Sequence, residues 1–231
     1  MPVQPTVVFD LDGTLVDTAT DLVATLNAVL AVEGMAPVDT QTMIGMVGSG
    51  SRVLIETAFQ AQGRALPPAT LDRLLKVFLA YYDDHIADTS RPYPGATATL
   101  DRFAAAGWLM AVCTNKFEAP ARKLLRLLGL EAYFAAITGQ DTFSFRKPDP
   151  RHLTETIRLA GGHPERAVMV GDSRTDIETA RAAAIPVVAV DYGYTLLPVA
   201  TLGATVVISS LEALYDAVGD LPLFVAMDAN R

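Results

Sequence analysis

The sequence predicts an α/β protein in which a mostly parallel sheet carries helices on both faces and a helical domain is inserted near the start. Short apolar, β-branched runs recur along the chain, and helical patterns separate them from the second run onward, as in open parallel sheets. The first two runs are roughly a hundred residues apart, whereas a strand–helix–strand unit needs only ~30 residues. The surplus is long enough to form a domain of its own.

Six apolar runs are expected to form the strands of the sheet. They are Thr6–Phe9, Leu109–Cys113, Ala135–Thr138, Ala167–Val170, Val187–Val190 and Thr205–Ile208. Strands that are buried on both faces of a parallel sheet read as nearly continuous apolar runs of this length. The order of the runs along the chain therefore predicts a layered core.

The long interval after the first run contains helical stripes and no convincing strand. One stripe ends at a glycine, Gly34, and consists of Leu22, Leu26, Val29 and Leu30. The second has i, i+3, i+4 spacing and consists of Leu71, Leu74, Leu75, Phe78, Leu79 and Tyr82. We expect residues 18–91 to form a helical cap domain and residues 1–17 and 92–231 to form the core, with Pro92-Tyr93-Pro94-Gly95 marking the return.

Composition limits the class of partner. Hydrophobic residues make up 51% of the 231 residues, so the chain can bury a sizeable core. A net charge of -8 and a pI near 4.8 argue against nucleic acid or an anionic membrane as the main partner. The single cysteine, Cys113, lies in an apolar run and is expected to be a buried, inert thiol. No secretory pattern or apolar run of ~18 residues is present, which favours a cytoplasmic protein. The sequence leaves the choice between a monomer and a homodimer open.

Two aspartates at the end of the first apolar run are the most informative feature. The run ends at Asp10, and Asp12, Gly13 and Thr14 follow. Two carboxylates held this close repel each other unless a cation or a reaction requires them. The pair therefore indicates a nucleophile and an acid/base residue beside a hard metal ion such as Mg²⁺.

Two plainer interpretations compete with this one. A calcium loop also spaces acids by two, but it needs an acid or amide at its fifth position and a glycine at its sixth. Here Thr14 stands at the fifth position, and the glycine comes early, at Gly13. The other interpretation is an ordinary strand-to-turn ending with solvated aspartates. The rest of the chain favours the catalytic interpretation.

Three further polar clusters follow strand-like runs. They are Thr114-Asn115-Lys116, Arg146-Lys147-Pro148-Asp149-Pro150 and Gly171-Asp172-Ser173-Arg174-Thr175-Asp176. Ligands of an open parallel sheet bind outside the carboxyl ends of its strands, so all four clusters are expected to converge on one crevice. Each cluster alone also fits a helix cap or an ordinary turn. Their order and their position after strands make the combination specific.

The residue types suit phosphoryl transfer through an aspartyl phosphate. Asp10 is expected to attack phosphorus, because a carboxylate can form a covalent acyl phosphate. Asp12 would protonate the leaving oxygen and then activate water for hydrolysis of the intermediate. Thr114, with Asn115 in support, would donate hydrogen bonds to the phosphoryl oxygens, and Lys147 would neutralise the charge that develops there.

The same clusters supply ligands for a magnesium ion. Asp172 would complete the site with Asp10 and the backbone carbonyl of Asp12, since hard cations favour oxygen ligands. Asp176 is expected to orient neighbouring groups such as Lys147. Thr14, within the first cluster, is expected to support the site.

With these motifs the chain resembles the haloacid dehalogenase-like hydrolase superfamily. The four motifs are Asp10-Leu11-Asp12-Gly13-Thr14, Thr114-Asn115, Lys147-Pro148 and Gly171-Asp172-Ser173-Arg174-Thr175-Asp176, and the match covers nearly the whole chain. Within the superfamily the chain is most similar to the phosphoglycolate phosphatases. The supporting segments are Val47-Gly48-Ser49-Gly50, Thr114-Asn115-Lys116, Lys147-Pro148-Asp149-Pro150, and Gly171 to Arg181 followed by Asp191-Tyr192-Gly193-Tyr194.

The resemblance implies a Rossmann-like core, magnesium dependence, small phosphomonoester substrates and closure of the cap over the bound substrate, which would exclude water. One departure is local. Relatives often have glycine at the position of Ala184, and an alanine held there in a left-handed conformation would cost roughly 1 kcal/mol.

A glycine-rich segment in the cap has two interpretations. Gly45, Gly48 and Gly50 fit either a flexible break between two helices or a specificity loop that lies over the site when the cap closes. A dinucleotide-binding loop is disfavoured by the spacing and by the absence of a preceding strand. Arg52 would bind a substrate carboxylate in the second interpretation, because its planar fork suits bidentate pairing. Its alternative is a solvated surface arginine.

The sequence therefore predicts a magnesium-dependent phosphatase for a small phosphorylated metabolite, with 2-phosphoglycolate as the leading substrate. A haloalkanoate dehalogenase would need neither Asp12 nor Asp172, and a phosphonate hydrolase would need a cap lysine other than Lys76, which falls in an ordinary helical pattern. A phosphosugar phosphatase, a pyrophosphatase and a phosphosugar mutase remain alternatives on the same core. A non-catalytic phosphate-binding module is a further alternative, but it would be free to lose Asp10 or Lys147.

Overall fold

The computed structural model describes residues 4–47, 50–195 and 197–228. Its main sheet has six strands in the order β5-β4-β1-β6-β7-β8, and every neighbouring pair is parallel. The strands are β1 (Thr6–Phe9), β4 (Leu109–Cys113), β5 (Ala136–Thr138), β6 (Ala167–Gly171), β7 (Val187–Val190) and β8 (Val206–Ile208). All six predicted strands are confirmed, and their ends differ from the predicted ones by at most one residue.

Strand β1 lies at the centre of the sheet and sets the position of the site. Val7, Val8 and Phe9 are fully buried, because β4 and β6 flank the strand and helices cover both faces. In register, Phe9 pairs with Val112 of β4 and with Val170 of β6. The residues that follow these three neighbouring strands therefore meet at one edge of the sheet.

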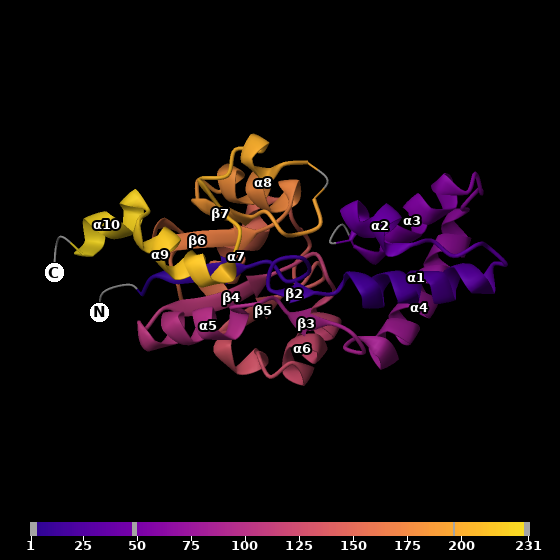
Figure 1. Ribbon diagram of the computed structural model, residues 1–231, viewed down its shortest axis with the longest axis horizontal. Coiled ribbons are helices and arrows are strands. Elements are labelled where there is room, and N and C mark those ends of the chain that lie inside the picture. Colours follow the sequence, from indigo (N-terminus) through magenta and orange to yellow (C-terminus); the bar gives the residue numbers. More distant parts are fainter. Residues whose placement is uncertain (1–3, 48–49, 196, 229–231) are drawn as a thin grey trace.

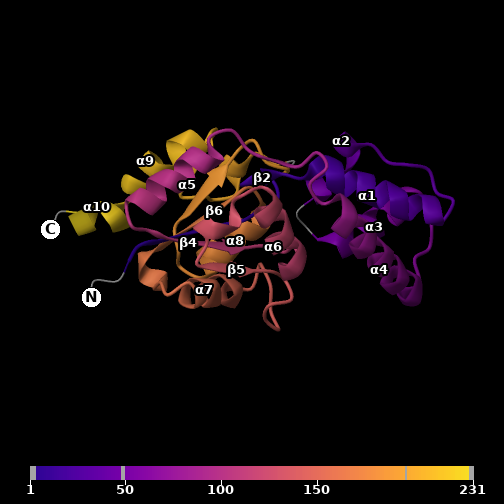
Figure 2. The ribbon, with the colours of Figure 1, turned by 90° about the horizontal axis from the view of Figure 1, so that it is seen from below.

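Helices form a layer on each face of the sheet, as Figure 2 shows for α5 and α9 on one side and α7 on the other. One layer consists of α5 (Ala96–Ala105), α6 (Glu118–Leu127) and α9 (Leu214–Gly219), and the other of α7 (Pro150–Leu159) and α8 (Arg174–Ala182). Alternate strand residues face opposite layers: Phe9 belongs to the first apolar cluster and Val8 to the second. This arrangement confirms the predicted fold class.

Short helical turns link the main elements. They are η1 (Ile44–Met46) in the inserted segment, and η2 (Glu131–Tyr133), η3 (Pro164–Arg166), η4 (Val199–Thr201) and η5 (Leu211–Ala213) in the core. The last helix, α10 (Pro222–Asp228), extends from the end of the molecule opposite the inserted helices (Figure 1). Its Phe224 ring lies 4.8 Å from the ring of Trp108, so this part of the C-terminal stretch packs on the core. No helix among the described residues has the length and apolarity needed to span a bilayer.

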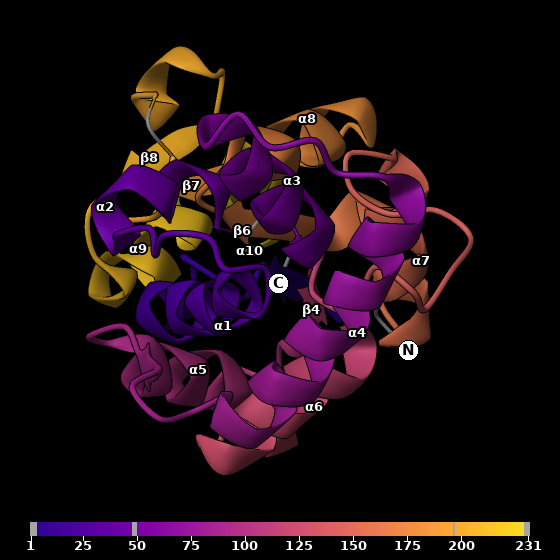
Figure 3. The same ribbon diagram turned by 90° about the vertical axis from the view of Figure 1, so that its right-hand side faces the viewer.

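The segment inserted after β1 is helical, as expected. It contains α1 (Ala19–Val32), α2 (Thr40–Met43), α3 (Ser51–Ala61) and α4 (Pro68–His85), which lie together beyond the carboxyl ends of the strands (Figures 1 and 3). Both predicted stripes are buried where they face neighbouring helices, including Leu26 of α1 and Leu74 of α4. Gly34 has a φ of 62° just after α1, as expected of a helix stop. The limits of 18 and 91 for a separate cap domain stay a prediction.

Two very short strands at the base of the insertion were missed. β2 (Val16–Asp17) and β3 (Arg91–Pro92) pair antiparallel where the chain leaves and re-enters the core. Just beyond them, the Asp21 carboxylate accepts hydrogen bonds from the backbone N–H and hydroxyl groups of Thr89 and Ser90, at 2.5–3.1 Å. Strands of two residues have no periodicity, so a sequence pattern could not indicate them.

Candidate active site

Asp10 directly follows β1, and the turn after it is tightly closed. The backbone N–H groups of Thr14, Leu15 and Val16 all donate to the carbonyl of Leu11, at 3.1–3.3 Å. Gly13 has a φ of 84°, and a Cβ at this position would lie only 2.6 Å from Asp172 Oδ2. Glycine is therefore required both for the turn and for the close approach of Asp172.

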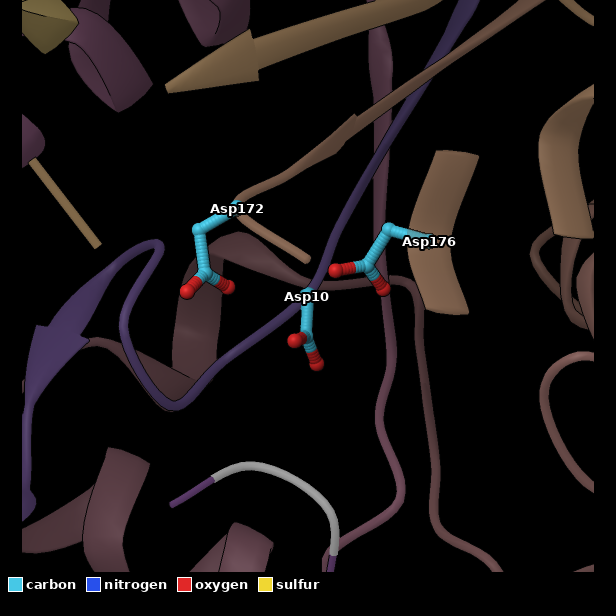
Figure 4. Close-up of side chains that lie close together, drawn as sticks. All are labelled: Asp10, Asp172 and Asp176. Atoms are coloured by element: carbon cyan, nitrogen blue, oxygen red, sulfur yellow. The ribbon is translucent and has the colours of Figure 1, made fainter. Parts of the chain in front are cut away.

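Three buried carboxylates converge at this edge of the sheet. Oxygens of Asp10, Asp172 and Asp176 lie within 4.8 Å of one another, and Figure 4 shows the three side chains close together. They come from the end of β1, from the end of β6 and from the first turn of α8. Asp172 is held from two sides, because Thr14 Oγ1 donates to its Oδ1 at 3.1 Å and the Tyr194 N–H donates to its Oδ2 at 2.7 Å.

Lys147 lies between two of these carboxylates. Its Nζ is 2.9 Å from Asp10 Oδ1 and 2.6 Å from Asp176 Oδ1. Asp176 also completes a capping box at the start of α8, where its Oδ2 accepts from the N–H and hydroxyl of Ser173. Both of its oxygens thus have partners, and Asp176 orients Lys147 while it caps the helix.

The backbone around Lys147 is fixed by two other side chains. The Lys147 N–H donates to Nδ1 of His152, a fully buried residue in the first turn of α7, and Asn115 Nδ2 donates to the Lys147 carbonyl. Burial lowers the pKa of His152 to about 4. The imidazole is therefore neutral near pH 7 and can accept this hydrogen bond.

A second buried lysine holds Asp12. Lys116 Nζ lies 2.9 and 3.2 Å from the two carboxylate oxygens of Asp12, and Thr18 Oγ1 donates to Asp12 Oδ1 at 2.7 Å. Thr114 supports this segment, because its hydroxyl accepts from the Lys116 N–H at 3.1 Å. Lys116 lies within the predicted cluster Thr114-Asn115-Lys116, but no role was expected for it.

Burial and mutual repulsion raise the pKa values of two of these carboxylates. Desolvation, followed by the negative charge of Asp176, raises the pKa of Asp10 to about 7. Desolvation and the charges of Asp176 and Asp10 raise the pKa of Asp172 to about 8. Despite its burial, the pKa of Lys147 is raised by Asp10 and Asp176, so the lysine stays charged.

The charges in this cluster suit a divalent cation. Four buried carboxylates, those of Asp10, Asp12, Asp172 and Asp176, face two buried lysines, Lys116 and Lys147. Two negative charges are in excess when all six groups are ionised, and an uncompensated buried charge is costly. The donors available are carboxylate oxygens, the ligands that hard cations such as Mg²⁺ prefer.

The structure places Arg52 outside this cluster. Its Nη2 pairs with Asp72 Oδ1 at 2.9 Å, and 46% of its side chain is exposed. The glycine-rich segment before it lies partly outside the described residues, at 48 and 49. Its described end contributes Gly50 and Ser51 to a cavity that also reaches Asp12. The structure thus brings together every predicted site residue except Arg52.

Three contributions were missed at the level of sequence. Lys116 and Tyr82 meet between core and cap, where the ammonium lies 4.6 Å from the ring centroid of Tyr82. Tyr194 binds Asp172 through its N–H and reaches the start of α1 with its hydroxyl. The position of Lys116 beside Thr114 and Asn115 was an available signal for a site residue. Tyr194 lies in the segment Asp191-Tyr192-Gly193-Tyr194 that supports the family resemblance, whereas Tyr82 was expected only in a helical stripe.

A parallel sheet with an inserted helical cap, and a buried group of aspartates and lysines at its carboxyl edge, defines a capped α/β enzyme core. Residues 7–190 match the family model described as haloacid dehalogenase-like hydrolase. The chain belongs to this family.

Named relatives and a solved structure extend this similarity over the chain. It is 58% identical to a phosphoglycolate phosphatase of Mesorhizobium japonicum over 91% of this chain and 93% of that protein. It is 50% identical to a phosphoglycolate phosphatase of Agrobacterium fabrum over 94% and 93%. The crystal structure of a predicted phosphoglycolate phosphatase from Haemophilus somnus has a TM-score of 0.86 and 26% identity, and covers 93% of this chain and 98% of that one. The prediction of a phosphoric monoester hydrolase is thereby confirmed.

Proposed function

We propose that the chain is a magnesium-dependent phosphatase that hydrolyses 2-phosphoglycolate to glycolate and phosphate through an aspartyl phosphate. The observation that carries the mechanism is the position of Asp10, at the end of the central strand and 2.9 Å from Lys147. The substrate is supported by the names of the relatives that match over nine tenths of the chain.

The first half of the reaction forms the covalent intermediate. A carboxylate oxygen of Asp10 attacks phosphorus, and the bond from phosphorus to the ester oxygen breaks. Asp12 gives its proton to the departing oxygen. Lys147 and the donors of Thr114 and Asn115 stabilise the charge on the transferring phosphoryl oxygens.

The second half regenerates the enzyme. Asp12, now a carboxylate, takes a proton from water as the water oxygen attacks phosphorus. The bond from phosphorus to Asp10 breaks, phosphate leaves and Asp10 is again a free carboxylate. Asp12 thus holds the proton needed for the next cycle.

The residues that would hold Mg²⁺ are Asp10, Asp172 and the backbone carbonyl of Asp12. When bound, the ion supplies positive charge that offsets the excess of buried carboxylates and the charge on phosphate. Thr14 and Tyr194 keep Asp172 in place through their hydrogen bonds, and Asp176 keeps Lys147 in place.

We propose a cytoplasmic location and a small phosphorylated metabolite as the partner, with the protein acting as a monomer or homodimer. A single, buried cysteine is compatible with a reducing compartment, and the acidic pI argues against nucleic acid or an anionic membrane as the main partner. Burial raises the pKa of the Cys113 thiol to about 12. The thiol therefore stays protonated and is a poor nucleophile.

Phosphate release tests the proposed function. The panel is 2-phosphoglycolate, several sugar phosphates, pyrophosphate and a chromogenic aryl phosphate, each with Mg²⁺ or with a chelator. We expect kcat/KM for 2-phosphoglycolate to exceed the others and to vanish without Mg²⁺ and in Asp10→Asn. A preference for a sugar phosphate or for pyrophosphate would contradict 2-phosphoglycolate as the substrate and would leave the proposed mechanism in place. No turnover at all would favour a mutase or a non-catalytic module.

A further inference from the structure

A small cavity lies beside Asp12, between the core and the inserted helices. Its volume is about 30 Å³, far below the roughly 300–1,000 Å³ of sites that hold drug-sized ligands. The inserted helices contribute an apolar wall to it, including Leu22, Leu54 and Phe78. Such a wall offers no partners for the hydroxyl groups of a sugar. Beside Asp12 the lining therefore suits a small leaving group with few hydroxyl groups.

The polar part of the cavity contains unused hydrogen-bond donors. An ammonium has three N–H donors, and among the described residues the side-chain nitrogen of Lys116 donates only to Asp12. The hydroxyl of Tyr82 is buried and has no hydrogen-bond partner among the described residues. Tyr82 and Lys116 both line the cavity. Burial raises the pKa of Tyr82 to about 12, so the hydroxyl keeps its proton and remains a donor.

Two donors with unused capacity and one positive charge are the chemistry that binds a carboxylate. We propose that Lys116 and Tyr82 bind a carboxylate of the leaving group, so that the site selects phosphoesters whose ester oxygen and carboxylate are attached to the same carbon. This inference rests on the proposed phosphatase function and adds the residues that set its substrate class.

Asp12 limits how far the substrate carboxylate can lie from the leaving oxygen. The leaving oxygen must lie within hydrogen-bond reach of the Asp12 carboxyl to receive its proton. Lys116 Nζ is 2.9 Å from that carboxyl, so an anion bound to the lysine lies close to the leaving oxygen. A carboxylate attached to the carbon that bears the leaving oxygen meets this condition, whereas a carboxylate one carbon further away is displaced from it.

The arrangement also links recognition to the cap. Tyr82 belongs to α4 of the insertion, whereas Lys116 follows β4 of the core. The two meet only when the inserted helices lie over the sheet, as they do here. A carboxylate that binds both residues therefore holds the two parts of the molecule together at the moment of reaction.

The test compares 2-phosphoglycolate with ethyl phosphate, whose leaving group has a similar size and no charge, and with 3-phosphooxypropanoate, whose carboxylate is one carbon further away. We expect the unaltered enzyme to prefer 2-phosphoglycolate over both. Lys116→Gln should lower the kcat/KM ratio of 2-phosphoglycolate to ethyl phosphate roughly 10- to 100-fold, as for loss of a hydrogen bond to a charged group. Tyr82→Phe should lower it about 2- to 10-fold.

Lys76→Gln removes the same charge from an exposed position of α4 and serves as the matched control, with an unchanged ratio. Equal losses on 2-phosphoglycolate and ethyl phosphate in both site variants would overturn the proposal and leave the phosphatase in place. The proposal would also be overturned if Arg52→Ala lowered the kcat/KM ratio of 2-phosphoglycolate to ethyl phosphate and the two site variants did not. If Lys116→Gln fails to fold, the proposal is tested by the ratio in Tyr82→Phe and by the preference of the unaltered enzyme among the three esters. An enzyme that turns over none of these esters would overturn the proposed function itself.

Discussion

The hydroxyl of Tyr194 accepts a hydrogen bond from the backbone N–H of Thr18 at 2.6 Å. The same hydroxyl accepts from the N–H of Ala19 at 3.0 Å and donates to Asp17 Oδ1 at 2.8 Å. Tyr194 also donates its own N–H to Asp172. One core residue thus connects a carboxylate of the site with the first residues of the inserted helices.

Tyr194→Phe is expected to loosen this connection without disturbing Asp172, whose contact is with the backbone. The Thr18 N–H loses its acceptor, whereas the Ala19 N–H keeps Asp17 Oδ1 at 3.3 Å. A buried donor left without a partner costs about 1–3 kcal/mol. Hydrogen exchange should become faster at Thr18, and less so at Ala19, and the free energy of unfolding should fall. Tyr215→Phe is the control, since no hydrogen bond of its hydroxyl is found among the described residues. Unchanged exchange at Thr18 would contradict the prediction.

Asp21→Asn is expected to weaken the contact between the two ends of the insertion. The carboxylate accepts four donor groups from Thr89 and Ser90, and the amide can replace only part of this set. We expect a loss of about 1–3 kcal/mol in the free energy of unfolding at pH 7, measured with urea.

The cost of Asp21→Asn should depend on pH. Burial acts to raise the pKa of Asp21, but the hydrogen bonds from Ser90 and Thr89 outweigh it and hold the pKa below the ordinary value of 3.8. The unfolded chain therefore takes up this proton first, so the contribution is complete above that value and is lost as the pH falls below it. A difference between wild type and variant that persisted unchanged well below this pH would count against the assignment.

Metal binding should stabilise the protein most at alkaline pH. The pKa values of Asp10 and Asp172 are raised to about 7 and about 8, so between about pH 4 and 8 the folded state holds protons that the unfolded chain has released. Without a divalent cation, these two groups make stability fall as the pH rises through this window. Mg²⁺ should thus raise Tm more at pH 8.5 than at pH 5, in melting curves recorded with Mg²⁺ or chelator. Asp172→Asn should abolish most of this gain, and an equal gain in the variant would exclude Asp172 as a ligand.

Ala184→Gly is expected to stabilise the protein. Ala184 follows α8 with a φ of 56°, and it is the single non-glycine residue with a positive φ in the described part of the chain. A side chain in this region costs roughly 1 kcal/mol, so removal of the Cβ should raise the free energy of unfolding by up to about that amount. Ala183→Gly, at a φ of -84°, should instead be neutral or destabilising. Urea unfolding of both variants separates the two cases.

The sheet was predictable because buried parallel strands leave continuous apolar runs, as in Ala167–Val170 and Val187–Val190. The positions of Asp10, Lys147 and Asp172 were predictable because each follows such a run, and parallel strands end at the same edge. The left-handed conformation expected for Ala184 is present. These features depend on local patterns and on one topological rule.

Other features depend on contacts between distant residues. Lys116 and Tyr82 meet across the gap between core and insertion, 34 positions apart in the sequence, and no local pattern indicates such a contact. The pairing of Arg52 with Asp72 likewise joins two helices of the insertion. The burial of His152 behind Lys147 depends on how α7 packs on the sheet.

The paired strands β2 and β3 place the two ends of the insertion side by side. Asp21 holds these ends together through its hydrogen bonds to Thr89 and Ser90. The inserted helices are thus attached to the core at one place, and none of the six main strands lies within the insertion. Changes in the length or sequence of the inserted helices can therefore leave the six-stranded sheet, and with it the positions of the aspartates and Lys147, unaltered.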